Sequence, residues 1–235
     1  MLRRLGGALV MASIGCVALP ARAQVGASLS LTSDYQWRGL SLSAGKPALS
    51  LNLSYDHASG LYGGLSTTAV DTDHSGVRPL GYLVYVGYAR RVSDRLSWDV
   101  GVTNSETTIY SYWRYSAHYT EAYGGVTAGA FSAHAYFSPK YIGGEEATIY
   151  LDADGAVRPA KDWRLFGHLG LLTPLSRSEA GRHVRARLDA RLGVARQFGH
   201  WEAHAAWSAI TSEPHDPVGY LQKRQKFAIG LDYFF

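Results

Sequence analysis

The sequence predicts an all-β protein, a closed antiparallel transmembrane up-and-down β-barrel of about 12 strands that follows a cleaved signal peptide. Three observations lead to this prediction. The chain starts with a short basic and apolar segment, apolar and polar residues alternate through most of the remainder, and long and short connections between the alternating stretches follow each other in turn.

Residues 1–23 show the three parts of a secretory signal peptide. A pair of arginines forms a basic start, residues 5–19 form an apolar stretch, and Ala21-Arg22-Ala23 has the small-residue pattern that precedes a cleavage site. The apolar stretch is shorter than the roughly 20 residues that a spanning helix needs, so we expect cleavage rather than an anchor. The barrel would then occupy residues 24–235.

Removal of this segment changes the charge balance. Arg3, Arg4 and Arg22 leave with it while every acidic residue stays, so 20 basic residues remain against 19 acidic ones and the formal net charge falls from +4 to +1. This near-neutral balance gives no reason to expect a nucleic-acid partner. Cys16 is the single cysteine and also leaves. The mature chain therefore has neither a disulfide framework nor a cysteine metal site.

Strict alternation of apolar and polar residues predicts the strands. In residues 25–38 the odd positions are mostly apolar and the even ones small or polar, and residues 47–57 repeat the pattern. The same pattern gives strands near 25–38, 47–57, 61–70, 80–91, 95–104, 117–127, 130–139, 146–157, 163–173, 183–198, 200–212 and 225–235. Most have the nine to eleven or so residues of a tilted membrane strand, and their number is even.

Long connections alternate with short ones. The first three long connections are GLSLSAGK, DTDHSGVRP and NSETTIYSYWRYS, whereas the first three short ones are ASG, VSD and TAG. This asymmetry is typical of long outer loops and short periplasmic turns, with both termini on the periplasmic side. The long loops at 104–116 and 212–224 are the candidates to fold inward and constrict the lumen.

Aromatic residues gather toward the strand ends, where amphipathic rings would lie at the headgroup level of a membrane. The girdle candidates are Tyr35, Trp37, Tyr55, Tyr82, Tyr88, Trp98, Trp163, Trp201 and Trp207. The chain finishes with KFAIGLDYFF, an aromatic strand ending in Phe235. Such an end resembles the recognition signal of proteins inserted by the bacterial barrel-assembly machinery. We therefore expect that machinery and outer-membrane lipid as partners.

The segment around the first expected strand resembles a known family. Thr32-Ser33-Asp34-Tyr35, followed by Trp37-Arg38-Gly39-Leu40-Ser41, is similar to the TorF-type or Gcw_chp family of proteobacterial outer-membrane barrel proteins, and so are Lys46-Pro47-Ala48 and residues 59–64. The similarity is close over the first two strands and the following hairpin. Leu65-Ser66-Thr67 departs from the Trp-Gly-Ser run expected there. The resemblance implies an outer-membrane barrel of a Gram-negative bacterium that acts as a porin, without an established solute.

Charged residues on the inward face are the candidates for function. Asp34 and Arg38 would share one face of the first strand, about 13 Å apart. An arginine on the lipid face costs roughly 2–4 kcal/mol near the midplane, so the charges of the strand at 183–198 must point inward. The pore-lining candidates are Asp34, Arg38, Asp152, Asp154, Arg164, His168, Arg185, Arg187, Asp189 and Arg191. They would form either a transverse field, acidic on one side and basic on the other, or a neutralised ladder of salt bridges.

These features favour a porin that lets small hydrophilic solutes diffuse passively through a narrow lumen, since 12 strands lie between a filled barrel of about eight and an open one of about 16. A non-conducting structural or interaction barrel is the alternative. A lipid-modifying enzyme is less favoured: Ser132 and His134 share a polar face, but no acidic residue is evident beside them. Asp71 and Asp73 could contact Ca²⁺, although exposed acidic loops are usually only solvated. We expect no enzyme activity, cofactor or resident metal.

Overall fold

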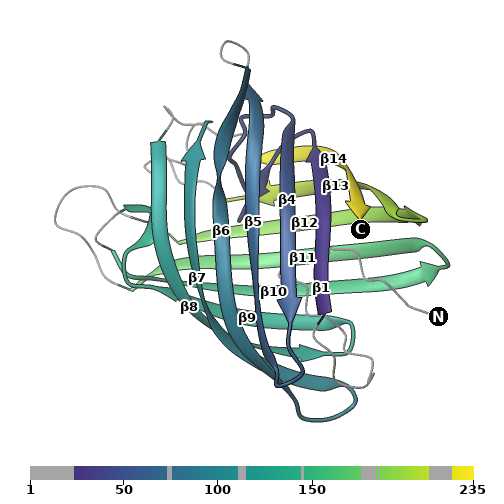
Figure 1. Ribbon diagram of the computed structural model, residues 1–235. Helices are drawn as coiled ribbons and strands as arrows, with labels where there is room; N and C mark the ends of the chain where they lie inside the picture. The colour runs from purple at the N-terminus through teal and green to yellow at the C-terminus, as the bar shows by residue number, and fades with distance from the viewer. Residues whose placement is uncertain are drawn as a thin grey trace.

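The computed structural model describes residues 24–72, 76–110, 115–143, 146–175, 184, 186–211 and 224–235. Within these residues the chain forms a closed antiparallel barrel of 12 strands and one separate two-stranded hairpin (Figure 1). The expected signal peptide, Arg185, Asp73 and the loop at 212–224 lie outside or almost wholly outside the described residues. The predicted fold class is confirmed.

The wall strands lie close to the predicted positions. They are β1 (Gln24–Thr32), β4 (Ala48–Asp56), β5 (Leu61–Thr72), β6 (Gly76–Arg91), β7 (Leu96–Ile109), β8 (Tyr115–Ala128), β9 (Phe131–Ser138), β10 (Thr148–Ala160), β11 (Trp163–Pro174), β12 (Arg187–Phe198), β13 (Trp201–Ile210) and β14 (Gln225–Phe234). The hairpin consists of β2 (Gln36–Trp37) and β3 (Leu40–Ser41), and η1 (Tyr141–Gly143) is a short 3-10 turn.

Each wall strand pairs with its neighbour in sequence, and β1 closes the barrel by pairing with β14 between Ser28↔Phe234 and Thr32↔Gly230. Closure leaves no open sheet edge, which a bilayer would not tolerate because unpaired backbone groups have no partner in hydrocarbon. In Figure 1 the front strands β1, β4, β5 and β6 run upright while the rear strands β10–β14 cross them. This crossing reflects the tilt of strands against a barrel axis.

The two faces of the wall differ in chemistry. On β4 the outward Leu49, Leu51 and Leu53 are exposed, whereas the inward Ser50 is buried. Exposed leucines, valines and phenylalanines cover the outside in the same way on the other strands, which is the surface that hydrocarbon accepts and water does not. No helix among the described residues is long and apolar enough to cross a membrane.

The first strand is shorter than predicted: β1 ends at Thr32 rather than at residue 38. Ser33 still bonds to β14, where its N–H donates to Ile229 O (2.9 Å), but the chain then leaves the wall. Arg38 (φ 47°) and Gly39 (φ 75°) have left-handed backbone conformations that a strand cannot contain. The prediction that Asp34 and Arg38 share a face of the first strand is therefore wrong.

Two girdle candidates and two loops also differ from the prediction. Tyr35 and Trp37 lie inside the barrel, packed against a buried cluster, whereas Trp163 and Trp201 are exposed on the outside. The expected loop at 104–116 is largely strand, since β7 reaches Ile109 and β8 starts at Tyr115. Residues 104–109 and 115–116 extend the two strands, because alternation persists into TTI and YSA, and the Tyr110 N–H donates to the Leu42 carbonyl (2.9 Å).

Candidate functional site

The lumen contains a loop that the sequence did not place there. Residues 33–46, here called the inner loop, join β1 to β4 and carry the β2–β3 hairpin. Leu40 and Leu42 of this loop are 1% and 4% exposed and belong to one buried cluster with wall residues of β4–β8 and β13. Burial of each leucine side chain contributes roughly 2 kcal/mol. The inner loop therefore fills the lumen near the long connections.

Asp34 holds the inner loop in shape. Its carboxylate accepts hydrogen bonds from Ser41 Oγ (2.5 Å), Ser43 Oγ (3.1 Å), the Gly45 N–H (3.0 Å) and Gln36 Nε2 (2.9 Å). One buried carboxylate thus satisfies donors from both halves of the loop. Short polar side chains that capture nearby backbone and hydroxyl groups are a common means of fixing a turn.

Arg38 joins the tip of the inner loop to the opposite wall. Its two terminal nitrogens donate to the two carboxylate oxygens of Glu121 on β8, at 2.9 and 2.6 Å. The side chains are only 6% and 2% exposed. Paired N–H···O bonds between guanidinium and carboxylate are among the strongest in proteins. Removing one partner of such a buried pair typically costs about 3–5 kcal/mol, because the other charge is left uncompensated.

Aromatic rings surround the same guanidinium. The Arg38 Cζ atom lies 4.0 Å from the ring centroid of Tyr150, 5.3 Å from that of Tyr136 and 5.8 Å from that of Tyr141. Distances below about 6 Å allow cation–π attraction. We call Glu121, Tyr136, Tyr141 and Tyr150 the cation cage. Its members come from β8, β9, η1 and β10, so the inner loop contributes none of them.

Further contacts tie the inner loop to other strands. Trp37 Nε1 donates to Tyr119 OH (2.9 Å), Ser208 Oγ donates to Gln36 Oε1 (2.5 Å) and Lys226 Nζ donates to the Gly39 carbonyl (3.1 Å). These partners lie on β8, β13 and β14. The tip of the loop thus spans the lumen from one side to the other.

Gly39 fits where a side chain would not. A Cβ atom added to it would lie 2.7 Å from Asp189 Cβ on β12, and its φ of +75° is in the left-handed region. Contacts below about 3 Å between such atoms force one of them to move. The Arg38-Gly39 step therefore requires glycine in this packed position.

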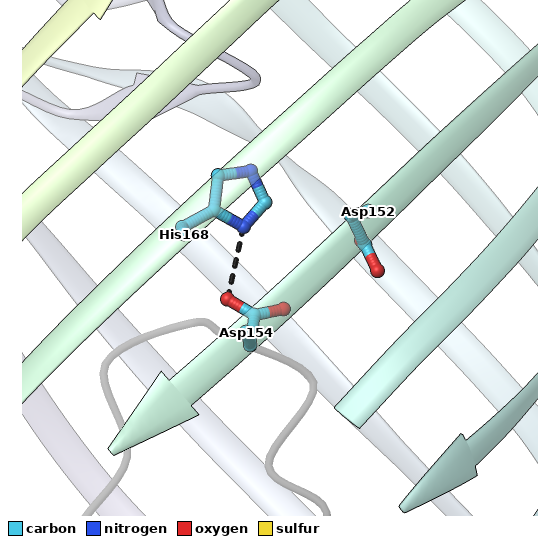
Figure 2. Close-up of side chains that lie close together, drawn as sticks. All are labelled: Asp152, Asp154 and His168. Carbon is cyan, nitrogen blue, oxygen red and sulfur yellow. Dashed lines mark hydrogen bonds and ion pairs between the residues drawn. The ribbon is translucent and has the colours of Figure 1, made fainter. Parts of the chain in front are cut away.

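Beyond the cation cage, the charged candidates meet in pairs across neighbouring strands. His168 on β11 lies between Asp154 on β10 (Nδ1–Oδ1 2.9 Å) and Asp189 on β12 (Nε2–Oδ1 3.1 Å); Figure 2 shows the first of these contacts. Tyr150 OH lies 2.9 Å from His168 Nε2. The hydroxyl of this cage tyrosine therefore touches the charged network.

The remaining charged candidates contact acidic, histidine or aromatic side chains of other strands. Arg164 pairs with Glu202 on β13, and the Arg191 guanidinium lies 6.0 Å from the ring centroid of Phe166. Asp152 lies 3.7 Å from His134 Nδ1 on β9. Arg187 is buried on the inward face of β12.

Asp152, Asp154 and His168 could in principle hold a metal ion, since one potential ligand atom from each lies within 4.8 Å of the others. Both nitrogens of the His168 ring already face a carboxylate oxygen. Figure 2 draws no hydrogen bond or ion pair from Asp152 to either member of this pair. A metal would have to displace a hydrogen bond of His168, so the geometry suits the ion pairs better.

The enzyme alternative rested on Ser132 and His134, with no acidic residue evident beside them. The structure corrects this expectation: His134 Nε2 lies 3.3 Å from Asp99 Oδ1, and Asp152 lies on its other side. Antiparallel pairing brings these acids from β7 and β10, which are distant in sequence. Ser132 and His134 are both buried on the inward face, away from lipid.

Burial changes along the lumen. Toward the long connections the inward Ser50, Ser66 and Thr68 are buried under the inner loop. Toward the short turns the inward Asn52 and Tyr62 are half-buried. On β4 and β5 the inward side chains are thus more exposed toward the short turns, whereas on β9 and β13 Ser132 and Glu202 are buried at that end as well.

Comparison with known proteins identifies the family of this barrel. The model of a family described as "Bacterial protein of unknown function (Gcw_chp)" matches residues 20–225. The chain belongs to the Gcw_chp family. The part of the sequence resemblance that named Gcw_chp is thereby confirmed. No curated relative matches the chain.

Solved porin structures share the fold of this Gcw_chp protein. The structure titled "KdgM porin" aligns with a TM-score of 0.56 at 12% identity, covering 88% of this chain and 99% of that one. A NanC porin structure aligns with a TM-score of 0.59 at 8% identity, covering 88% and 98%. At these identities the similarity shows the fold alone, which is that of outer-membrane porins.

Proposed function

We propose that this Gcw_chp protein is an outer-membrane porin of a Gram-negative bacterium, through which small hydrophilic solutes diffuse passively. The observation that carries the proposal is the closed porin-like barrel with an apolar outside and a polar inside. The resemblance to TorF-type porins supports it. Export by the segment 1–23 and insertion through the strand ending in Phe235 belong to the same proposal.

The inner loop makes this a gated porin. The conformation described here is closed at the long-connection end, because Leu40 and Leu42 are packed against the wall. Passage requires the loop to leave its place. A loop held by a few discrete contacts has two alternative states, and its equilibrium can be shifted by a few kcal/mol.

The charged candidates would set selectivity in the open state. Asp152, Asp154 and Asp189 line one part of the lumen, and Arg187 and Arg191 extend along β12. Whether these charges act as a transverse field or as a neutral ladder is tested by the ion selectivity of single channels. A shift toward cation preference in Arg187→Ala supports the field, and unchanged selectivity supports the ladder.

Reconstitution into planar bilayers tests the porin proposal. We expect rare, brief openings for the wild-type chain and long-lived openings when the loop contacts are weakened, as in Arg38→Ala. Steady conductance in that variant supports the proposal. Silent bilayers for both proteins, with correct folding shown by circular dichroism, would refute it.

A second function, a non-conducting structural or interaction barrel, is favoured by one observation. The apolar cluster around Leu40 and Leu42 resembles a permanent protein core more than a constriction in water. In that case weakening of the Arg38 contacts would reduce stability without producing conductance. We propose no catalytic role for the chain.

A further inference from the structure

We propose that the cation cage is a binding site for small organic cations that carry a guanidinium group, and that Arg38 occupies this site as a tethered substitute for the solute. This inference rests on the proposed porin function and adds the class of solute that opens the channel. Glu121, Tyr136, Tyr141 and Tyr150 form the site, and all four belong to the wall or to the turn before β10.

The cage keeps its chemistry when the inner loop leaves. Of the described rings near the guanidinium, Trp37 alone belongs to the loop (5.4 Å from its centroid), so the three tyrosines and the carboxylate remain. Glu121 is 2% exposed in the closed state and accepts both hydrogen bonds from Arg38. Its carboxylate would then require another cation or bulk water as partner.

The shape of the cage selects a planar cation. The two Glu121 oxygens accept two parallel N–H groups at 2.9 and 2.6 Å, while the Tyr150 ring lies 4.0 Å from the central carbon. A guanidinium presents a flat fork that satisfies both contacts. An ammonium group is a point charge whose donors do not match the two carboxylate oxygens as well. An anion would be repelled by the carboxylate and by the negative faces of the rings.

Charged side chains of β10, β11 and β12 adjoin the cage. Tyr150 OH contacts both His168 (2.9 Å) and the Asp189 carboxylate (3.2 Å). Asp154 lies next, against the other nitrogen of His168 and partly exposed. The two carboxylates thus flank His168, and Arg164 and Arg191 lie on β11 and β12 as well. Acidic and basic side chains therefore lie together beside the cage, and Tyr150 is the cage member that contacts them.

Solute binding and loop closure exclude each other, because one guanidinium occupies the cage at a time. A ligand that binds only the open state shifts the equilibrium toward it. The cation that permeates is thus also the signal that releases the inner loop. Arg38 acts as the competitor that keeps the channel closed when such solutes are scarce.

Calorimetric titration of purified Arg38→Ala with agmatine tests the inference, because the variant leaves the cage vacant. We expect saturable binding, at least tenfold weaker in Arg38→Ala/Glu121→Gln and in Arg38→Ala/Tyr150→Leu. Arg38→Ala/Tyr150→Phe is the matched control, since it keeps the ring and should bind within about threefold of Arg38→Ala. Circular dichroism confirms the folded barrel for each variant. Equal binding by Arg38→Ala and Arg38→Ala/Glu121→Gln, or no binding by either, overturns the inference.

Wild-type protein supplies a second measurement that needs no Arg38 substitution. Millimolar agmatine should increase the open probability in bilayers several-fold, whereas equal concentrations of sodium chloride or glutamate should not. If Arg38→Ala binds agmatine but the bilayers stay silent, the porin proposal is refuted, whereas the proposed binding site is supported. If the bilayers conduct but agmatine and sodium change the open probability equally, the proposed binding site is refuted, whereas the porin function is supported.

Discussion

Replacement of Arg38 by alanine should release the inner loop. In the closed state the substitution leaves the Glu121 carboxylate buried without its two charge-assisted bonds, whereas in the open state Glu121 meets water in either protein. The substitution therefore destabilises the closed state by nearly the full free energy of the lost ion pair and hardly changes the open state. A loss of about 3 kcal/mol, at the lower end for broken buried pairs, raises the open-to-closed ratio roughly 100-fold.

Cysteine labelling measures this ratio. Leu42 is 4% exposed inside the buried cluster, and Cys16 is the single cysteine of the chain. A Leu42→Cys thiol in a Cys16→Ser background reacts with a maleimide only when the loop opens. When closing is fast relative to labelling, the rate is proportional to the open population. We expect Arg38→Ala to raise this rate about 100-fold.

The double variant Arg38→Ala/Glu121→Gln is the control for the mechanism. It removes the uncompensated charge, so its labelling rate should fall at least fivefold below that of Arg38→Ala. Arg38→Lys should be intermediate, because lysine keeps the charge without the fork. Labelling of Arg38→Ala at the wild-type rate would refute the reasoning that this ion pair holds the loop.

Four further predictions use other contacts. Gly39→Ala should raise the labelling rate at least tenfold, because the added Cβ would lie 2.7 Å from Asp189 Cβ. Gly45 has a similar φ but no atom within 4 Å of an added Cβ, so Gly45→Ala should have a smaller effect. Equal effects of the two substitutions would exclude the close contact as the cause. Trp37→Phe removes the 2.9 Å bond to Tyr119 and should raise the rate about fivefold, and an unchanged rate would show that this bond contributes nothing. Arg187→Ala should shift the reversal potential of open channels toward cation preference, and an unchanged potential would support a neutral ladder. Leu169→Arg, on the outward face in the middle of β11, should lower the free energy of unfolding in lipid vesicles by about 2–4 kcal/mol, whereas Leu169→Met should not; equal stabilities would contradict contact with hydrocarbon.

The wall strands could be predicted from the sequence because the pattern that indicates them lies within each strand. Each strand alternates between two environments, so a stretch such as 47–57 reveals its faces without reference to any partner. The barrel also pairs neighbours in sequence, which leaves few alternative topologies. Eleven of the expected strands therefore coincide with wall strands, with ends that differ by at most five residues.

The inner loop could not be predicted in the same way. The alternation of residues 25–32 continues by chance through Tyr35 and Trp37, so the pattern extends past the real end of β1. Only Gly39 signalled a break, and one glycine is compatible with an ordinary loop. The decisive contacts, Asp34 with Ser41 and Arg38 with Glu121, depend on chain reversal and on a strand 83 residues away.

Glu121 itself carried a signal that was missed. It is an acidic residue on the inward face of a strand whose other inward residues include Tyr119 and Tyr123, and all three are buried. A carboxylate among tyrosines on an inward face calls for a cation. The sequence does not reveal its partner, because the alternation places Arg38 on a wall strand.

The most direct test of the account is a reversible lock on the inner loop. Ser208 Oγ and Gln36 Oε1 lie 2.5 Å apart, so cysteines at these positions in a Cys16→Ser background can be joined by a short cleavable cross-linker. Single-channel recording should show silence in the linked state and openings after cleavage in the same bilayer. Equal conductance before and after cleavage, with the cross-link confirmed by mass spectrometry, would contradict the claim that residues 33–46 close the lumen.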